Sequence, residues 1–299
     1  MLLMLILFCY FGLIVAVAFL VLTERGVLGL AQIRKGPNTV GPWGVVQCVA
    51  DRLKLMTKYK IYLSPTSKVL YTFSPVLLTI LTIVLISTSP IPYSISHTAN
   101  SILLIFRVLS LLSIPFILLG FAYGSVYSTV GSIRVVRLIM SYEILLLILI
   151  IFFKRKLRSW TWVYTTDNLM SNSNFVSHLP LIIPILVLWL IELGRTPFDL
   201  AERESELVSR FNVEYGRWRF LLFFFSEMLC LITISLIFSV LLIQEDKIIL
   251  LIFWMIIFII RSLCIRAALP RFRLIDTQNF VWFRLTPAVI TIRVLIHVF

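Results

Sequence analysis

The chain has 299 residues, of which 60% are hydrophobic, and its mean hydropathy is +1.01. Soluble domains are about 45–50% apolar, so this composition excludes an ordinary soluble protein and predicts an all-α integral membrane protein. The formal net charge is +13. Because the basic residues lie mainly in the segments between apolar stretches, we assign them to orientation of the chain in the membrane rather than to nucleic-acid binding.

Cysteine and histidine are few and scattered. No two cysteines form a CxxC pair, which argues against an iron–sulfur cluster, a zinc site or a disulfide framework. No two histidines share a helix face at a spacing suited to haem. We therefore expect no redox cofactor and no metal in this chain. The residues concerned are Cys9, Cys48, Cys230, Cys264, His97, His178 and His297.

Eight windows are long enough to cross about 30 Å of hydrocarbon. They are 1–23, 69–90, 101–123, 135–153, 179–193, 220–243, 248–265 and 281–298. The first carries no basic region ahead of it, so we expect a retained span rather than a removable signal. Loops after the odd-numbered spans hold most of the lysines and arginines, which places them on the cytoplasmic or matrix side. The basic cluster at 154–158 is the exception.

We expect one polytopic membrane domain over 1–299, with inside loops at 24–68, 124–134, 194–219 and 266–280. The first loop contains a turn-rich basic stretch and then an amphipathic segment with apolar residues at helical spacing. This pattern predicts a helix that lies in the membrane interface. It serves either as a plain lipid-surface anchor or as the border of a lateral opening for a lipid-soluble ligand. Its apolar residues are Val45, Val46, Val49, Leu53 and Met56.

Residues 192–215, here called the acidic loop, hold six of the 14 acidic residues of the chain. Thr196, Pro197 and Asp199 form a helix start with a capping hydroxyl, a proline and an early acid. In the predicted loop helix Asp199, Glu202 and Glu206 share one face, and Glu204 points elsewhere. A solvated helix with i, i+4 pairs to Arg203 and Arg210 is one interpretation. The six acids are Glu192, Asp199, Glu202, Glu204, Glu206 and Glu214.

Two further carboxylates lie inside predicted spans. Glu143 is roughly 15 Å and Glu227 roughly 12 Å from the nearest charged span end, at a rise of 1.5 Å per residue. A buried carboxylate is costly unless it is paired, protonated or hydrated. Several at similar depth, leading from the acidic loop, favour a proton or ion relay. The last inside loop, 266–273, supplies either orientation charge or a docking surface for an acidic partner.

Long motifs resemble subunit 1 of the respiratory NADH:quinone oxidoreductase (complex I) family and follow one another in the same order along 1–298. Their residues are Glu24-Arg25; Gln32-x-Arg-Lys-Gly-Pro-Asn-x-x-Gly-Pro42; Gln47-x-x-Ala-Asp-x-x-Lys-Leu55; Ser141-Tyr-Glu143; Glu192-x-x-Arg-Thr-Pro-Phe-Asp-Leu-Ala-Glu-x-Glu-Ser-Glu-Leu-Val-Ser-x-Phe-Asn-Val-Glu-Tyr215; and Pro270-Arg-Phe-Arg273. The chain departs from the family pattern at Tyr59-Lys60, at Arg137, at Arg203 and Arg210, and over 215–219.

The resemblance implies a core membrane subunit that forms the quinone access tunnel with the hydrophilic arm and relays quinone-linked charge changes to proton-pumping neighbours. Ubiquinone would be the substrate, and flavin and iron–sulfur clusters would belong to partner subunits. Carried over residue by residue, the relay would contain Glu143, Glu192, Glu202 and Glu227. The quinone cavity and tunnel would contain Glu24, Arg25, Arg34, Asp51, Arg195, Asp199, Glu204 and Glu206. Arg271 and Arg273 would bind partner subunits.

Three other functions compete with this one. A homologous membrane subunit of a hydrogen-evolving complex would couple without quinone, and a self-contained ion transporter would work alone. A purely structural membrane scaffold would keep its activity when any of the acids is replaced. No internal repeat of the kind common in transporters is evident. Abundant Phe, Ile and Leu with scarce Gly suit an organelle-encoded protein. We therefore expect the mitochondrial inner membrane, with a bacterial plasma membrane as the alternative.

Overall fold

The computed structural model describes residues 2–58, 67–89, 101–157, 175–198, 215–243, 248–270 and 272–298. The regular elements in these ranges are all helical, which confirms the all-α prediction. In chain order they are α1 (Leu2–Ala31), η1 (Pro42–Gly44), α2 (Gln47–Thr57), α3 (Lys68–Thr88), α4 (Ser101–Leu111), α5 (Ser113–Tyr123), α6 (Val126–Leu157), α8 (Phe175–Glu192), α10 (Trp218–Ile243), α11 (Ile248–Ala268), α12 (Leu274–Asn279), the π-helical η4 (Phe280–Leu285) and α13 (Thr286–Val298).

A helix occupies each of the eight predicted spans. Among the residues that the structure describes, five stretches are long and apolar enough to cross a bilayer by themselves: 11–31, 68–88, 101–122, 218–240 and 249–268. The other three predicted spans fall on α6, on α8 and on η4 with α13. Helix α6 contains several arginines and lysines and one acid, while α8 is a mostly apolar helix of 18 residues.

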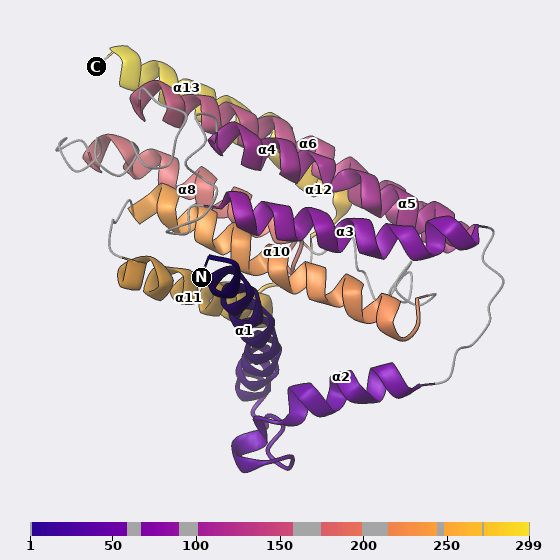
Figure 1. Ribbon diagram of the computed structural model, residues 1–299. Helices are drawn as coiled ribbons and strands as arrows, with labels where there is room; N and C mark the ends of the chain where they lie inside the picture. Colours follow the sequence, from indigo (N-terminus) through magenta and orange to yellow (C-terminus); the bar gives the residue numbers. More distant parts are fainter. Residues whose placement is uncertain are drawn as a thin grey trace.

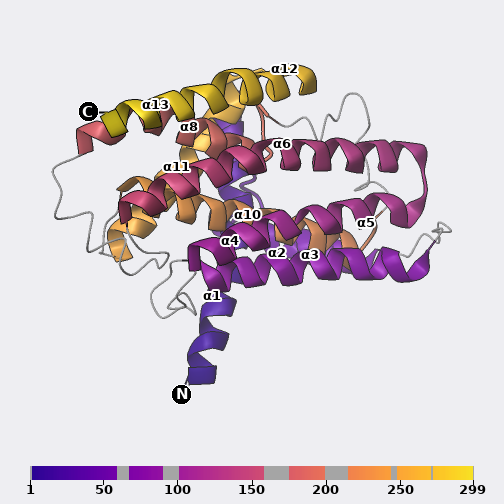
Figure 2. The same cartoon turned by 90° about the horizontal axis from the view of Figure 1, so that it is seen from above.

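The helices lie in successive levels in Figure 1, and α1 is steeply inclined to the others. Helices α4, α5, α6 and α13 run along one side in Figure 1, α3 and α10 lie beneath them, and α11 and α1 lie lower still. Figure 2 shows α3, α5 and α6 side by side, with α1 projecting away from them toward the N-terminus. Packing follows this order, because α3 contacts α5 and α10, and α11 contacts α1 and α10.

Two helices are joined closely because their contact residues are small. Ser128 of α6 donates a hydrogen bond of 2.7 Å to the carbonyl of Gly120 in α5. A Cβ added at Gly120 would lie 2.0 Å from the Ser132 hydroxyl oxygen. Small residues let membrane helices approach closely, which is how helix pairs gain contact energy without a hydrophobic driving force.

Several hydroxyl groups in the spans are hydrogen bonded to the backbone of their own helix. Ser226, Ser235 and Ser262 each donate to the carbonyl three residues earlier, at 2.6, 2.8 and 2.7 Å. Because hydrocarbon offers no hydrogen-bond partners, this local bonding lets polar side chains lie within a span without leaving a donor unsatisfied.

Candidate functional site

A buried cluster of three charges joins distant parts of the chain. Glu24, near the end of α1, forms ion pairs with both Arg195, which follows α8, and Arg266, in the last turn of α11. The Glu24 side chain is 10% exposed and that of Arg195 is 16% exposed. Charges so far from water are stable only when paired, so this charged cluster fixes the relative positions of α1, α11 and the start of the acidic loop.

The segment that carries Arg195 is held by further contacts. It leaves α8 through Gly194, whose φ of 58° lies in the left-handed region that glycine adopts readily. The Phe272 amide donates to the carbonyl of Pro197 at 3.1 Å, and the rings of Phe198 and Phe272 stack at 5.6 Å between centroids. The first residues of the acidic loop are thus fixed against the stretch between α11 and α12.

A second, more exposed ion pair connects α1 to α2. Arg25 donates to Asp51 at 2.5 Å, and the Gln47 amide donates to the same carboxylate at 2.9 Å. The hydrogen bond and the positive charge of Arg25 hold the pKa of Asp51 below its ordinary value, although partial burial acts in the opposite direction. Arg34 lies apart from this pair, exposed, and donates to the Gln32 side chain at 2.9 Å.

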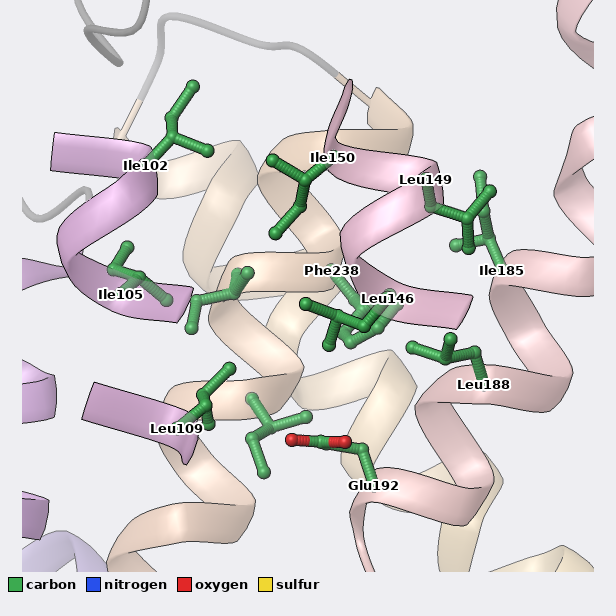
Figure 3. A pocket seen from close by; sticks show the side chains of 12 residues that line it. Ile102, Ile105, Leu109, Leu146, Leu149, Ile150, Ile185, Leu188, Glu192 and Phe238 are labelled. Carbon is green, nitrogen blue, oxygen red and sulfur yellow. The ribbon is translucent and has the colours of Figure 1, made fainter. Parts of the chain in front are cut away.

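Glu192, at the end of α8, points into the apolar interior. Its Oε2 atom is buried and finds no hydrogen-bond partner among the described residues. Figure 3 shows the carboxylate directed into a space otherwise lined by aliphatic and aromatic side chains from α4, α6, α8 and α10, including Leu109, Leu146 and Leu188. This cavity has a volume of about 40 Å³, which exceeds the 10–15 Å³ that one water molecule needs.

Glu143 faces the same region from α6. A small cavity of about 10 Å³ lies between Glu143 and Glu192, lined also by Ser110 and Tyr142. Ser110 of α4 donates to the carbonyl of Arg107 at 2.9 Å and lines this small cavity beside Glu143. Two of the predicted relay acids, 49 positions apart in the sequence, are therefore brought together across the contact between α6 and α8.

The third described relay acid, Glu227, is half-buried on α10. Cys230, one turn further along, is close enough to interact electrostatically with both Glu227 and Glu192. Glu143 and Glu192 thus line one small cavity, whereas Glu227 lies on the neighbouring helix α10 and lines neither cavity described above. The fourth predicted relay acid, Glu202, lies outside the described residues.

Other predicted site residues also lie outside the described ranges. This applies to the loop helix after Thr196 and to the partner-docking residue Arg271, whereas Arg273 is described and exposed just before α12. Arg266, which the sequence analysis grouped with the docking loop, pairs with Glu24 instead. The tunnel and cavity residues that fall outside are Asp199, Glu204 and Glu206.

Aromatic side chains hold the other end of the acidic loop. The Tyr215 ring stacks on Tyr71 of α3 at 4.5 Å, and the Arg219 guanidinium lies 4.3 Å from the centre of the same Tyr71 ring. The Tyr215 hydroxyl is 3.3 Å from the Ser74 hydroxyl and donates to the Leu119 carbonyl at 3.3 Å. We call Tyr71, Tyr215 and Arg219 the aromatic cluster; sequence spacing gave no sign of it.

Comparison with known proteins agrees with the motifs. The family model described as NADH dehydrogenase matches residues 3–297. Similar relatives named NADH-ubiquinone oxidoreductase chain 1 include those of Varanus jobiensis, 36% identical over 95% of this chain and 91% of the relative, and Bradypus variegatus, 37% identical over 92% and 89%. That of Danio rerio is 40% identical over 72% of this chain and 66% of its own length. On this match across nearly the whole sequence, the chain belongs to the NADH dehydrogenase family.

Proposed function

We propose that this chain is the core membrane subunit of a proton-pumping NADH:ubiquinone oxidoreductase, in which it forms part of the quinone access tunnel and relays charge changes to the membrane arm. The observation that carries the proposal is the position of Glu192. Its carboxylate lies three residues before Arg195 of the charged cluster, yet it points into an apolar cavity next to Glu143. In this proposal, one short segment would connect the inside surface with the membrane interior.

The tunnel part of the proposal rests on α1 and α2. The Arg25–Asp51 pair holds α2 against the end of α1, and Val49, Leu53 and Met56 of α2 are 50–57% exposed. An exposed apolar face in the interface gives a lipid-soluble ligand a surface to cross. Arg25, Asp51 and the charged cluster would then form the polar wall that orients a quinone head group.

The relay part rests on the three described acids. A carboxylate in an apolar cavity changes its protonation when a charge or water molecule appears nearby, and the cavity beside Glu192 is large enough to admit water. A charge change at the acidic loop would act first on Glu192 and then on Glu143 across the small shared cavity. Glu227, linked through the surroundings of Cys230, would extend the path along α10.

The test replaces Glu192 and Glu143 separately by glutamine in the assembled complex. Loss of a proton-transfer group lowers the coupled rate by about tenfold or more, so we expect that fall in NADH:ubiquinone reductase activity and in proton pumping. Asp276→Asn, an exposed carboxylate on α12, is the matched control. Parental activity and pumping in both glutamine variants would exclude the relay.

Partners and location belong to the same proposal. The chain would sit in the mitochondrial inner membrane, and flavin and iron–sulfur clusters would be held by neighbouring subunits of the hydrophilic arm. Purification of the chain with subunits that carry these cofactors, with quinone-dependent NADH oxidation, is the expected result. Recovery of an active chain alone would favour a transporter, and cofactors without quinone reduction would favour a hydrogen-evolving complex.

A further inference from the structure

We propose that the C-terminal end of α2 and residues 217–219 together form a binding site for the headgroup of an anionic phospholipid. The two segments are far apart in the sequence but meet directly, because Arg217 donates through Nη2 to the carbonyl of Met56 at 3.2 Å. Met56 lies in the last turn of α2, where helix carbonyls lack partners and the helix dipole is negative. The guanidinium of Arg217 therefore sits on this helix end.

The site is rich in positive charge. Lys54 and Lys58 are exposed at the same end of α2, Arg217 contacts it, and Arg219 lies two residues further along at the start of α10. Within the described ranges none of these four cations forms a salt bridge to a carboxylate. The acid of α2, Asp51, is already bonded to Arg25. The cluster thus has the charge of an anion-binding surface without a described protein anion.

Apolar side chains lie next to these cations. Leu53 is 57%, Met56 is 50% and Trp218 is 38% exposed. Trp218 also contributes a ring 5.3 Å from the Arg219 guanidinium, and the Nε atom of Arg219 is buried without a hydrogen-bond partner among the described residues. Tryptophan and arginine together are typical of the membrane–water interface.

A phospholipid matches both features at once. Its phosphate offers an acceptor and a negative charge to Lys54, Lys58 and Arg217, and its acyl chains cover the exposed faces of Leu53 and Met56. Basic clusters on an amphipathic helix recognise anionic headgroups in this way. An acidic protein surface would satisfy the cations but leaves the apolar side chains without the hydrocarbon that their place in the interface predicts, so we assign the site to lipid.

The experiment uses the intact complex. It is first transferred into phosphatidylcholine vesicles that contain a minority of phosphatidylglycerol and is then purified from them in detergent. Native mass spectrometry counts the phosphatidylglycerol that remains bound. The attraction between one cation and an anionic headgroup increases the retention of that lipid roughly fivefold. We expect at least that loss for Lys54→Gln with Lys58→Gln, and a similar loss for Arg217→Gln that Arg217→Lys restores. Arg284→Gln, exposed on η4 away from α2, is the control.

A second readout separates lipid binding from general damage. The exposed lysines make no described contact that folding depends on, so the lysine variant should assemble normally and lose only the difference in activity between vesicles with and without phosphatidylglycerol. Unchanged phosphatidylglycerol retention in both the lysine and the Arg217→Gln variants would overturn the proposal. Cross-linking of Lys54 or Lys58 to an acidic partner subunit in the parent complex would also overturn the proposal, because it would assign the site to that subunit.

Discussion

The two ends of the acidic loop are held in different ways. At the first end, Glu24 pairs with two arginines in a largely buried cluster. At the second end, the Tyr71 ring contacts both the Tyr215 ring and the Arg219 guanidinium, and no carboxylate takes part among the described residues. The charged cluster is held by attraction between opposite charges, whereas the aromatic cluster is held by ring stacking and a cation–π contact. The first attachment should therefore depend on the charge of Glu24, and the second on the ring of Tyr71.

The largest effect is expected for Glu24→Leu. The change leaves Arg195 and Arg266 facing each other without their shared counter-charge, and an unpaired buried charge costs about 3–5 kcal/mol. We expect a strong decrease in the amount of assembled complex, measured by native gel electrophoresis, and in its NADH:ubiquinone reductase activity. Glu24→Asp keeps the charge and should be milder. Normal assembly of the leucine variant would show that the first end does not depend on charge pairing.

A smaller effect is expected for Tyr71→Leu. The leucine fills part of the space but loses both the ring stack and the cation–π contact, together about 1–3 kcal/mol. The acidic loop should become more sensitive to limited proteolysis near Tyr215, with little dependence on salt concentration. Tyr127→Leu, which changes a tyrosine that is 69% exposed, serves as the control. Equal cleavage of both variants would mean that contacts other than the aromatic cluster hold the second end of the acidic loop.

The smallest effect concerns the exposed pair that joins α1 to α2. The pKa of Asp51 is lowered from 3.8 chiefly by Arg25, so its contribution is fully present above that value and is lost as the pH falls through the lowered pKa. Because the side chains are 49% and 34% exposed, we expect only about 0.5 kcal/mol.

Hydrogen exchange of the α2 amides measures this difference. The parent and Asp51→Asn should differ near neutral pH and converge at acidic pH, and the comparison at each pH cancels the intrinsic exchange rate. A constant difference across the pH range would mean that the carboxylate charge of Asp51 does not hold α2 in place.

Local sequence patterns predicted the positions of the helices better than the contacts between their side chains. Hydropathy located the helices, and helical spacing identified the exposed apolar face of α2, because both depend on neighbouring residues. The pairing of Glu24 with Arg266 joins positions 242 apart, and charge alone does not tell which of many inside arginines an acid meets. Similarly, Arg219 looked like an orientation charge until the fold placed it against Tyr71. Tertiary packing decided these contacts.

The close contact between α5 and α6 has a consequence for how the sequence can change over time. Gly120 and Ser132 share a space that holds the side chain of one of them. A methyl group at position 120 is therefore acceptable only when the residue at position 132 becomes smaller. A larger residue at position 132 is excluded as long as the separation of the two helices stays the same. Among related chains these two positions should vary as a pair, with their combined volume nearly constant.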